Sequence, residues 1–228
     1  MLTDAEYNAV LLSIQVALAS VALMLPPGIA VAWLLARRRF VGKAVVDALV
    51  HLPLVLPPVV VGYLLLELFG RNGPLGGPLS RAGISVAFTW RAAAIASAVV
   101  GFPLLVRAVR LSIELVDGRL EEAARTLGAT RLWTFLTVTL PLCLPGVLSG
   151  MVLAFARSLG EFGATMTFAG NVPGRTQTLP LAVYTYIQTP HAEASVHRLA
   201  LVSVLLSFAA LMMSDVLARR LRRRWGHA

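Results

Sequence analysis

Five stretches of the chain are long enough and apolar enough to cross a lipid bilayer as helices. A helix needs about 20 apolar residues to span the hydrocarbon core. Only 14% of the residues are charged, whereas a soluble domain has about a quarter. The sequence therefore predicts an all-α polytopic membrane protein with five transmembrane helices, in which residues 1–228 form a single transmembrane domain. The predicted spans cover about residues 9–36, 45–69, 92–109, 142–160 and 199–217.

Basic residues predict the orientation of these spans. Arg37, Arg38 and Arg39 directly follow the first span, and an arginine cluster at 219–224 follows the last. Because basic flanks stay in the cytoplasm, the N-terminus is predicted outside and the C-terminus inside. The net charge of +9 then reflects membrane topology rather than nucleic-acid binding. Asp4 and Glu6 precede the first span, so no cleavable signal peptide is predicted.

Prolines interrupt the first two spans. Pro26 and Pro27 predict a kink in the first. In the second, Pro53, Pro57 and Pro58 leave two interpretations open. One is a kinked span packed against its neighbours, and the other is a broken helix that lines a cavity. Within an external segment at 161–197, the apolar run is too short to cross and predicts a re-entrant or interfacial piece.

Residues 117–141 are the polar segment between the third and fourth spans. Asp117 is suited to cap a new helix. Glu121 and Glu122 then fall in or near its first turn, where negative charge interacts favourably with the helix dipole. Gly128 ends or bends that helix, and a second helix follows. On pattern alone, the segment is either a solvated amphipathic linker or a smooth surface that another protein can approach closely.

Arg157 and Glu161 stand four residues apart at the outer end of the fourth span. An ionisable residue near membrane depth is a candidate functional group, because burying it unpaired is expensive. Two structural roles are the alternatives to a functional one. Arg157 and Glu161 can form an ion pair with each other, or the Arg157 side chain can extend outward to water. The four histidines and the single Cys143 have no spacing that suggests metal ligands or a catalytic group, so no metal, cofactor or catalytic site is predicted.

Six residues of the polar segment resemble the EAA motif of ABC importer permeases. They are Glu122, Ala123, Ala124, Gly128, Leu140 and Pro141, and Val138 stands where the family usually has isoleucine. The resemblance implies a type I importer permease fold. It also implies that 117–141 is a cytoplasmic coupling loop that docks on a separate ATP-hydrolysing subunit. A membrane scaffold or an enzyme without transport is disfavoured.

Residues 54–66, 124–129 and 156–168 are similar to those of bacterial molybdate ABC transporter permease subunits, and the similarity runs over essentially the whole chain. It implies an inner-membrane homodimer with two ATPase copies and a periplasmic binding protein that delivers molybdate or tungstate. A sulfate or thiosulfate permease is the alternative. The expected pathway or gate residues are Arg157, Ser158, Glu161, Phe162, Gly163, Pro57 and Pro58.

Overall fold

The computed structural model describes residues 2–225, except for the side chains of 214, 215 and 217–225. All regular structure in this described part is helical. Four helices are long and apolar enough to span a membrane, and a bent pair of helices makes a fifth if it is counted as one span. The helices are α1 (Asp4–Arg37), α2 (Lys43–Val55), α3 (Pro58–Phe69), α4 (Gly76–Arg81), α5 (Trp90–Glu114), α6 (Gly118–Thr126), α7 (Arg131–Thr134), η1 (Phe135–Thr139), α8 (Leu140–Leu159), α9 (Gly163–Phe168), α10 (Leu179–Ile187) and α11 (Glu193–Trp225).

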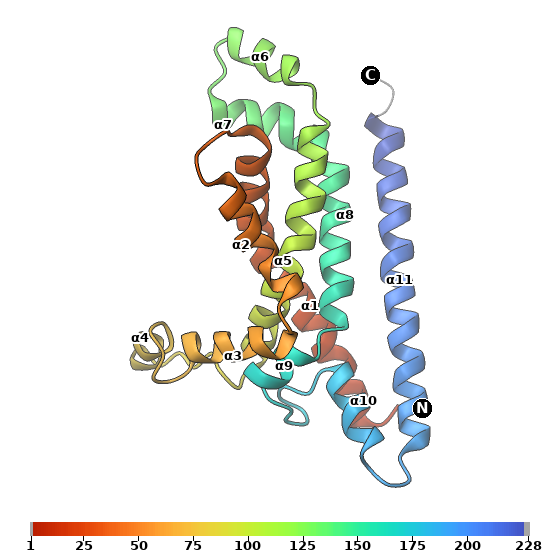
Figure 1. Ribbon diagram of the computed structural model, residues 1–228. Coiled ribbons are helices and arrows are strands. Elements are labelled where there is room, and N and C mark those ends of the chain that lie inside the picture. Colours follow the sequence, from red (N-terminus) through yellow and green to blue (C-terminus); the bar gives the residue numbers. More distant parts are fainter. Residues whose placement is uncertain (1, 226–228) are drawn as a thin grey trace.

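Helices α1, α5 and α8 run along the length of the molecule and pack on one another, and α11 lies beside α8 (Figure 1). Leu35, Leu105 and Cys143 are fully buried in the apolar core between the first three. The close approach of α8 to α5 depends on Gly146, since a side chain there would collide with Ser112. Burial of small and aliphatic side chains between long helices is the packing expected of a membrane bundle.

The predicted second span is two helices, α2 and α3, bent by 113° at the break between them. Leu56 and Pro57 are extended there, because a residue before a proline is pushed out of the helical region and proline offers no amide to continue the helix. Helix α3 leaves the bundle sideways (Figure 1). The structure shows a broken helix, as the second of the two interpretations requires, and its expected place beside a translocation cavity stays a prediction. Helix α1, by contrast, continues through Pro26 and Pro27 without interruption.

The predicted external segment folds as two short helices. Helix α9 packs against α3, and α10 packs against α11 and α1. An ion pair that the sequence did not suggest closes this end: Arg198 Nη2 lies 2.8 Å from Glu6 Oε1, with the carboxylate buried and the guanidinium partly exposed. Glu6 is fully buried and also caps α1 through a reciprocal hydrogen-bond pair with Thr3. The pair ties the first residues of α1 to α11.

The two ends of the molecule differ in what they hold (Figure 1). The N-terminus and α10 lie at one end, whereas α6, α7 and the end of α11 lie at the other. The polar segment at 117–141 is therefore separated by the full length of the bundle from the N-terminal end of α1.

Candidate coupling and translocation sites

Residues 117–141, called the coupling segment after their predicted role, consist of the short helix α6, a tight turn at Gly128, and the start of the long helix that α7, η1 and α8 form together. The Asp117 carboxylate accepts a hydrogen bond from the Arg119 amide, 2.9 Å away, and so caps α6 as the sequence predicts. Gly128 has a φ of +90°, which a side chain would disfavour. Thr130 then caps α7 by accepting from the Trp133 amide. The helix, turn and second helix all follow from local sequence.

The motif residues of α6 are on the surface of the chain. Glu122 and Ala123 are exposed and Ala124 is half-buried. Leu127 is 90% exposed although it is aliphatic. This face of α6 is thus a smooth surface with little side-chain bulk, which is suited to close contact with another protein. Leu140 and Pro141 instead begin α8, so the last motif residues belong to the spanning helix rather than to the turn.

Glu121, the neighbour of the motif glutamate, makes the contacts that hold α6 to the bundle. Its Oε1 accepts from Arg37 Nε at 3.0 Å and from the Thr139 hydroxyl at 2.7 Å. Arg37 also donates to the carbonyl oxygen of Val116. Sequence reasoning placed Glu121 in the first turn but gave it no partner. Its partners lie 84 and 18 residues away, so no local signal identifies them.

The helix between α7 and α8 is a π-helix, η1, with Thr139 at its end. Wider turns of this kind are found mostly at functional positions. Here η1 turns the buried Thr139 hydroxyl toward Glu121. Helices α7, η1 and α8 together form one continuous apolar span from Arg131 to Leu159.

Residues 157–163, called the charged segment, sit at the other end of α8. Arg157 Nη2 lies 2.7 Å from Glu161 Oε2, in an ionic contact whose angle is poor for a hydrogen bond. Glu161 is 2% exposed, and its Oε1 accepts from the Ala164 amide at 2.9 Å. Arg157 reaches solvent with about a third of its side chain. The structure thus contains the predicted ion pair, with the acid buried and the base accessible.

The break between α2 and α3 lies against this charged segment. A Cβ atom on Gly163 would fall 2.9 Å from Pro58 Cβ, and one on Gly62 would fall 2.7 Å from the Ala164 carbonyl oxygen. Both glycines therefore allow α3 and α9 to touch through their backbones. Two stretches that the sequence marked separately, around Pro57 and around Glu161, come together in one place.

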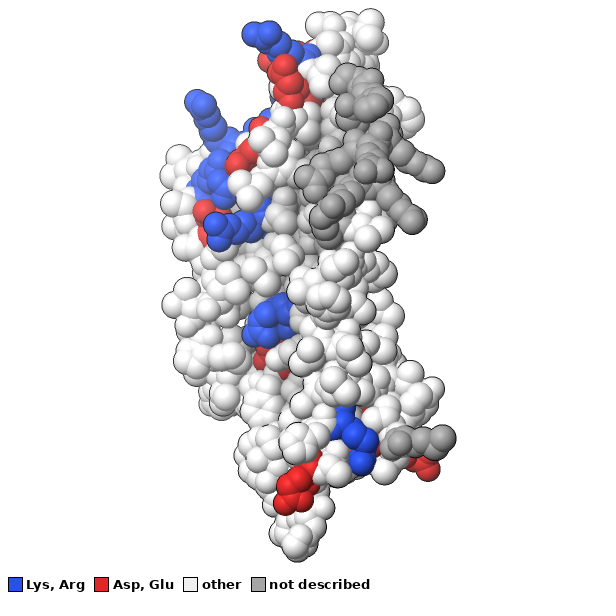
Figure 2. Space-filling view, turned by 90° about the vertical axis from the view of Figure 1, so that its right-hand side faces the viewer, with Lys and Arg blue, Asp and Glu red and all other residues white. Residues whose placement is uncertain are grey.

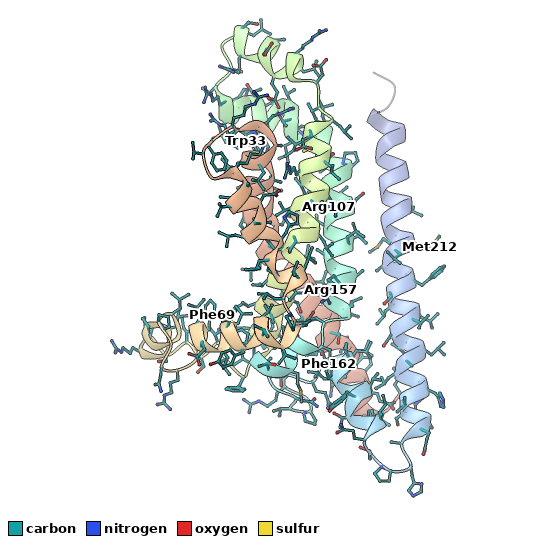
Figure 3. All side chains as sticks on the ribbon, viewed as in Figure 1. Trp33, Phe69, Arg107, Arg157, Phe162 and Met212 are labelled. Atoms are coloured by element: carbon teal, nitrogen blue, oxygen red, sulfur yellow. The ribbon has the colours of Figure 1, made fainter. Side chains whose placement is uncertain are left out.

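The other residues expected in the pathway face different surroundings. Ser158 is buried and shares a 2.8 Å hydrogen bond with Ser20 of α1. Phe162 packs on Tyr184 of α10, with ring centres 5.1 Å apart, and lines an apolar pocket of about 590 Å³ between α8, α10 and α11. In Figure 3, Phe162 lies below Arg157, toward the end of the molecule that holds α10.

Charge is distributed unevenly over the surface. Figure 2 shows charged side chains mostly near the two ends, with an isolated basic patch above an acidic one in the white middle. Another ionic cluster joins α2 to α5, where Asp47 Oδ1 lies 3.0 Å from Arg110 Nη1. Among the residues that the structure describes, no three His, Cys, Asp or Glu side chains are grouped as a metal site requires.

Residues 28–223 match the family described as "Binding-protein-dependent transport system inner membrane component". The chain belongs to this family. It is 57% identical over 227 residues to the molybdenum transport system permease protein ModB of Escherichia coli (strain K12), with 99% of each chain covered. It is 40% identical over 196 residues to the sulfate transport system permease protein CysT of Salmonella typhimurium, which covers 85% of this chain and 71% of that one.

A solved structure shares the fold. An inward-facing form of the MetNI methionine ABC transporter aligns with a TM-score of 0.69 at 18% identity, covering 95% of this chain and 94% of that chain. From its family and its relatives, the protein is a multi-pass inner-membrane permease of a binding-protein-dependent transport system, and it is not itself an enzyme.

Proposed function

We propose that the chain is the permease subunit of a molybdate importer, driven by ATP hydrolysis in a separate subunit. The observation that carries this proposal is the 57% identity, over nearly the whole of both chains, to a permease named for molybdenum transport. The lower identity of 40% to the sulfate permease makes sulfate or thiosulfate the second candidate. Tungstate, an oxyanion of the same shape and charge, is the expected second substrate.

Uptake into vesicles tests the choice of oxyanion. The permease is reconstituted with the ATPase and the binding protein of the same transport system, and accumulation of labelled molybdate and labelled sulfate is measured with and without ATP. ATP-dependent uptake of molybdate that excess sulfate does not block supports the proposal. Uptake of sulfate with no uptake of molybdate would transfer the assignment to the second candidate.

The proposed assembly is a homodimer of this chain with two ATPase copies and a periplasmic binding protein. Helix α2 supports a second copy, because none of its residues is buried in the single chain and its side chains Val45, Leu49 and Val55 are more than half exposed. The exposed face of α6 supports docking of the ATPase, with Glu122, Ala123, Ala124 and Gly128 at the contact.

For the orientation, we propose the N-terminus outside and the C-terminus inside. Labelling with a membrane-impermeant thiol reagent tests this on a Cys143→Ser background. A cysteine at the exposed Asn72 should react in intact cells, and one at the exposed Thr130 only after permeabilisation. Thr176 is 1% exposed, so the neighbouring exposed Arg175 is the better second outside position. Labelling of Thr130→Cys in intact cells would reverse the orientation.

For the pathway, we propose that Arg157 contributes positive potential at the outer mouth, next to the break at Pro57 and Pro58. A doubly charged oxyanion needs donors or positive charge along a low-dielectric route. The guanidinium offers two parallel donors and is partly accessible. The buried Glu161 beside it reduces the local field, so the anion is attracted without being trapped.

A further inference from the structure

A pocket of about 200 Å³ lies beside the coupling segment, where α1 ends. Four arginines line it, namely Arg37, Arg38, Arg125 and Arg131, and Glu121 is its only carboxylate. Four positive charges less one negative charge leave a lining of +3. A water molecule occupies roughly 30 Å³ in the liquid, so the pocket has room for a group several times larger.

Three of these arginines have no ionic partner among the described residues. Arg37 donates to Glu121 and to a backbone carbonyl. No carboxylate in the described part of the chain lies within ion-pairing distance of Arg38, Arg125 or Arg131. Because the Glu121 carboxylate of the lining is paired with Arg37, the three other guanidinium groups create a field that favours an anion.

The walls of the pocket are aromatic. Trp33 and Phe135 meet edge to face with ring centres 6.0 Å apart, and the Arg38 guanidinium carbon lies 5.3 Å from the centre of the Trp33 ring. Nearby, Leu132 is 69% and Trp133 is 61% exposed. Tryptophan beside arginine at the end of an apolar span is the arrangement typical of the headgroup layer of a membrane.

We propose that this pocket is a binding site for a phosphate group, supplied by the headgroup of an anionic phospholipid. Arginine is the side chain that best matches phosphate oxygens, through paired donors. The exposed Leu132 and Trp133 would lie along the glycerol and upper acyl region of the same lipid. The choice of an anionic lipid rests on the proposed orientation, in which the pocket lies at the cytoplasmic leaflet, because anionic lipids are enriched in that leaflet.

The site links the lipid to the coupling segment. Arg125 comes from α6, Arg131 from α7 and Arg38 from the residues after α1, so a phosphate in the pocket touches all three elements at once. It would add to the internal contacts that already hold α6, namely those of Glu121 with Arg37 and with Thr139. The bound lipid therefore stabilises the position of α6 relative to the bundle.

Native mass spectrometry of the full-length permease tests the site. The protein is exchanged into mixed phosphatidylglycerol and phosphatidylcholine, and the phosphatidylglycerol retained by each chain is compared among variants. The double variant Arg38→Gln, Arg131→Gln should lose about fivefold in affinity for each arginine removed. The matched control is Arg39→Gln with Arg119→Gln, which removes two exposed arginines of the same end that do not line the pocket, and it should retain the lipid.

Thermal unfolding identifies the source of the phosphate. The wild type is kept in phosphatidylcholine, and either phosphatidylglycerol or millimolar inorganic phosphate is added. A higher unfolding temperature with phosphatidylglycerol only supports a lipid, whereas a higher unfolding temperature with inorganic phosphate only supports a free anion in the same site. The double variant should respond to neither. Equal lipid retention by both double variants would overturn the proposal. Release of the ATPase by Arg38→Gln, Arg131→Gln with unchanged lipid retention would also overturn it, because the arginines would then serve the ATPase.

Discussion

The coupling segment and the charged segment carry the residues proposed to be functional in opposite ways. In the coupling segment, Glu122 and Ala123 of α6 are exposed and Ala124 is only half-buried. In the charged segment, Glu161 is 2% exposed and two glycine contacts join its surroundings to α3. A substitution in the first therefore acts through a partner, and a substitution in the second acts first through the chain's own packing.

This difference also explains why neighbouring residues of one type have different roles. Glu121 and Glu122 are adjacent in the first turns of α6, yet Glu121 holds two internal hydrogen bonds whereas Glu122 is exposed. The first glutamate positions the helix, and the second is free to contact another protein. Five single substitutions and one double variant test the comparison, from the largest expected effect to the smallest.

Arg157→Gln should have the largest effect, because it leaves the Glu161 carboxylate buried without its counter-charge. We expect about 2–3 kcal/mol of lost stability, less than for a fully buried pair since Arg157 reaches solvent. Molybdate uptake should fall while the ATPase still co-purifies. Thermal unfolding and vesicle uptake measure the two effects, and Arg91→Gln, an exposed arginine of α5, is the control.

A double variant separates the structural from the functional part of this effect. Replacement of both Arg157 and Glu161 by glutamine should recover most of the stability, since no lone charge remains. If it also restores full uptake, Arg157 has no direct role in the pathway. Recovered stability with low uptake supports the proposed role.

Gly62→Leu should disturb the backbone contact between α3 and α9. A Cβ there would lie 2.7 Å from the carbonyl oxygen and 2.9 Å from the Cα of Ala164, and overpacking of this kind costs about 1–3 kcal/mol. We expect a lower unfolding temperature and lost uptake with the ATPase still bound. Val60→Leu, on the same helix at an exposed position, should change neither.

Gly128→Leu should act without any internal clash, because nothing lies within 4 Å of a Cβ at this position. The positive φ costs about 1 kcal/mol for a residue with a side chain, so the permease should stay in the membrane. Its affinity for the ATPase should fall by about tenfold, or about 1.4 kcal/mol, in a pull-down. Gly118→Leu, also in open space but without a positive φ, is the matched control. An unchanged pull-down with continued transport would refute the docking assignment.

The two adjacent glutamates give the smallest and most specific contrast. Glu121→Gln should lower the unfolding temperature slightly, since a partly exposed ion pair contributes about 0.2–1 kcal/mol. Glu122→Lys should leave that temperature nearly unchanged, because Glu122 is exposed and lies beyond the first turn of α6, where the helix dipole has little effect. It should weaken the ATPase contact, because it reverses a charge on the proposed docking surface. The comparison fails if Glu122→Lys destabilises the isolated permease more than Glu121→Gln does.

The sequence alone predicted what depends on neighbouring residues. The cap at Asp117, the turn at Gly128 and the ion pair of Arg157 with Glu161, which was one of the alternatives for that pair, involve residues at most four apart, so their geometry follows from helix periodicity and turn chemistry. The apolar stretches likewise predicted the long helices, because a backbone in a bilayer has to satisfy its own hydrogen bonds. The family followed from a motif whose spacing is fixed along the chain.

Only the tertiary structure decided which distant residues meet. Whether the prolines of the second span bend or break it depends on what lies beside them, and here Gly163 lets α9 pack directly on Pro58. The partners of Glu121 and of Glu6 are 84 and 192 residues away. The basic pocket combines arginines from α6, α7 and the end of α1. Contacts of this kind leave no local pattern, because they are set by how whole helices pack rather than by the preferences of the residues that make them.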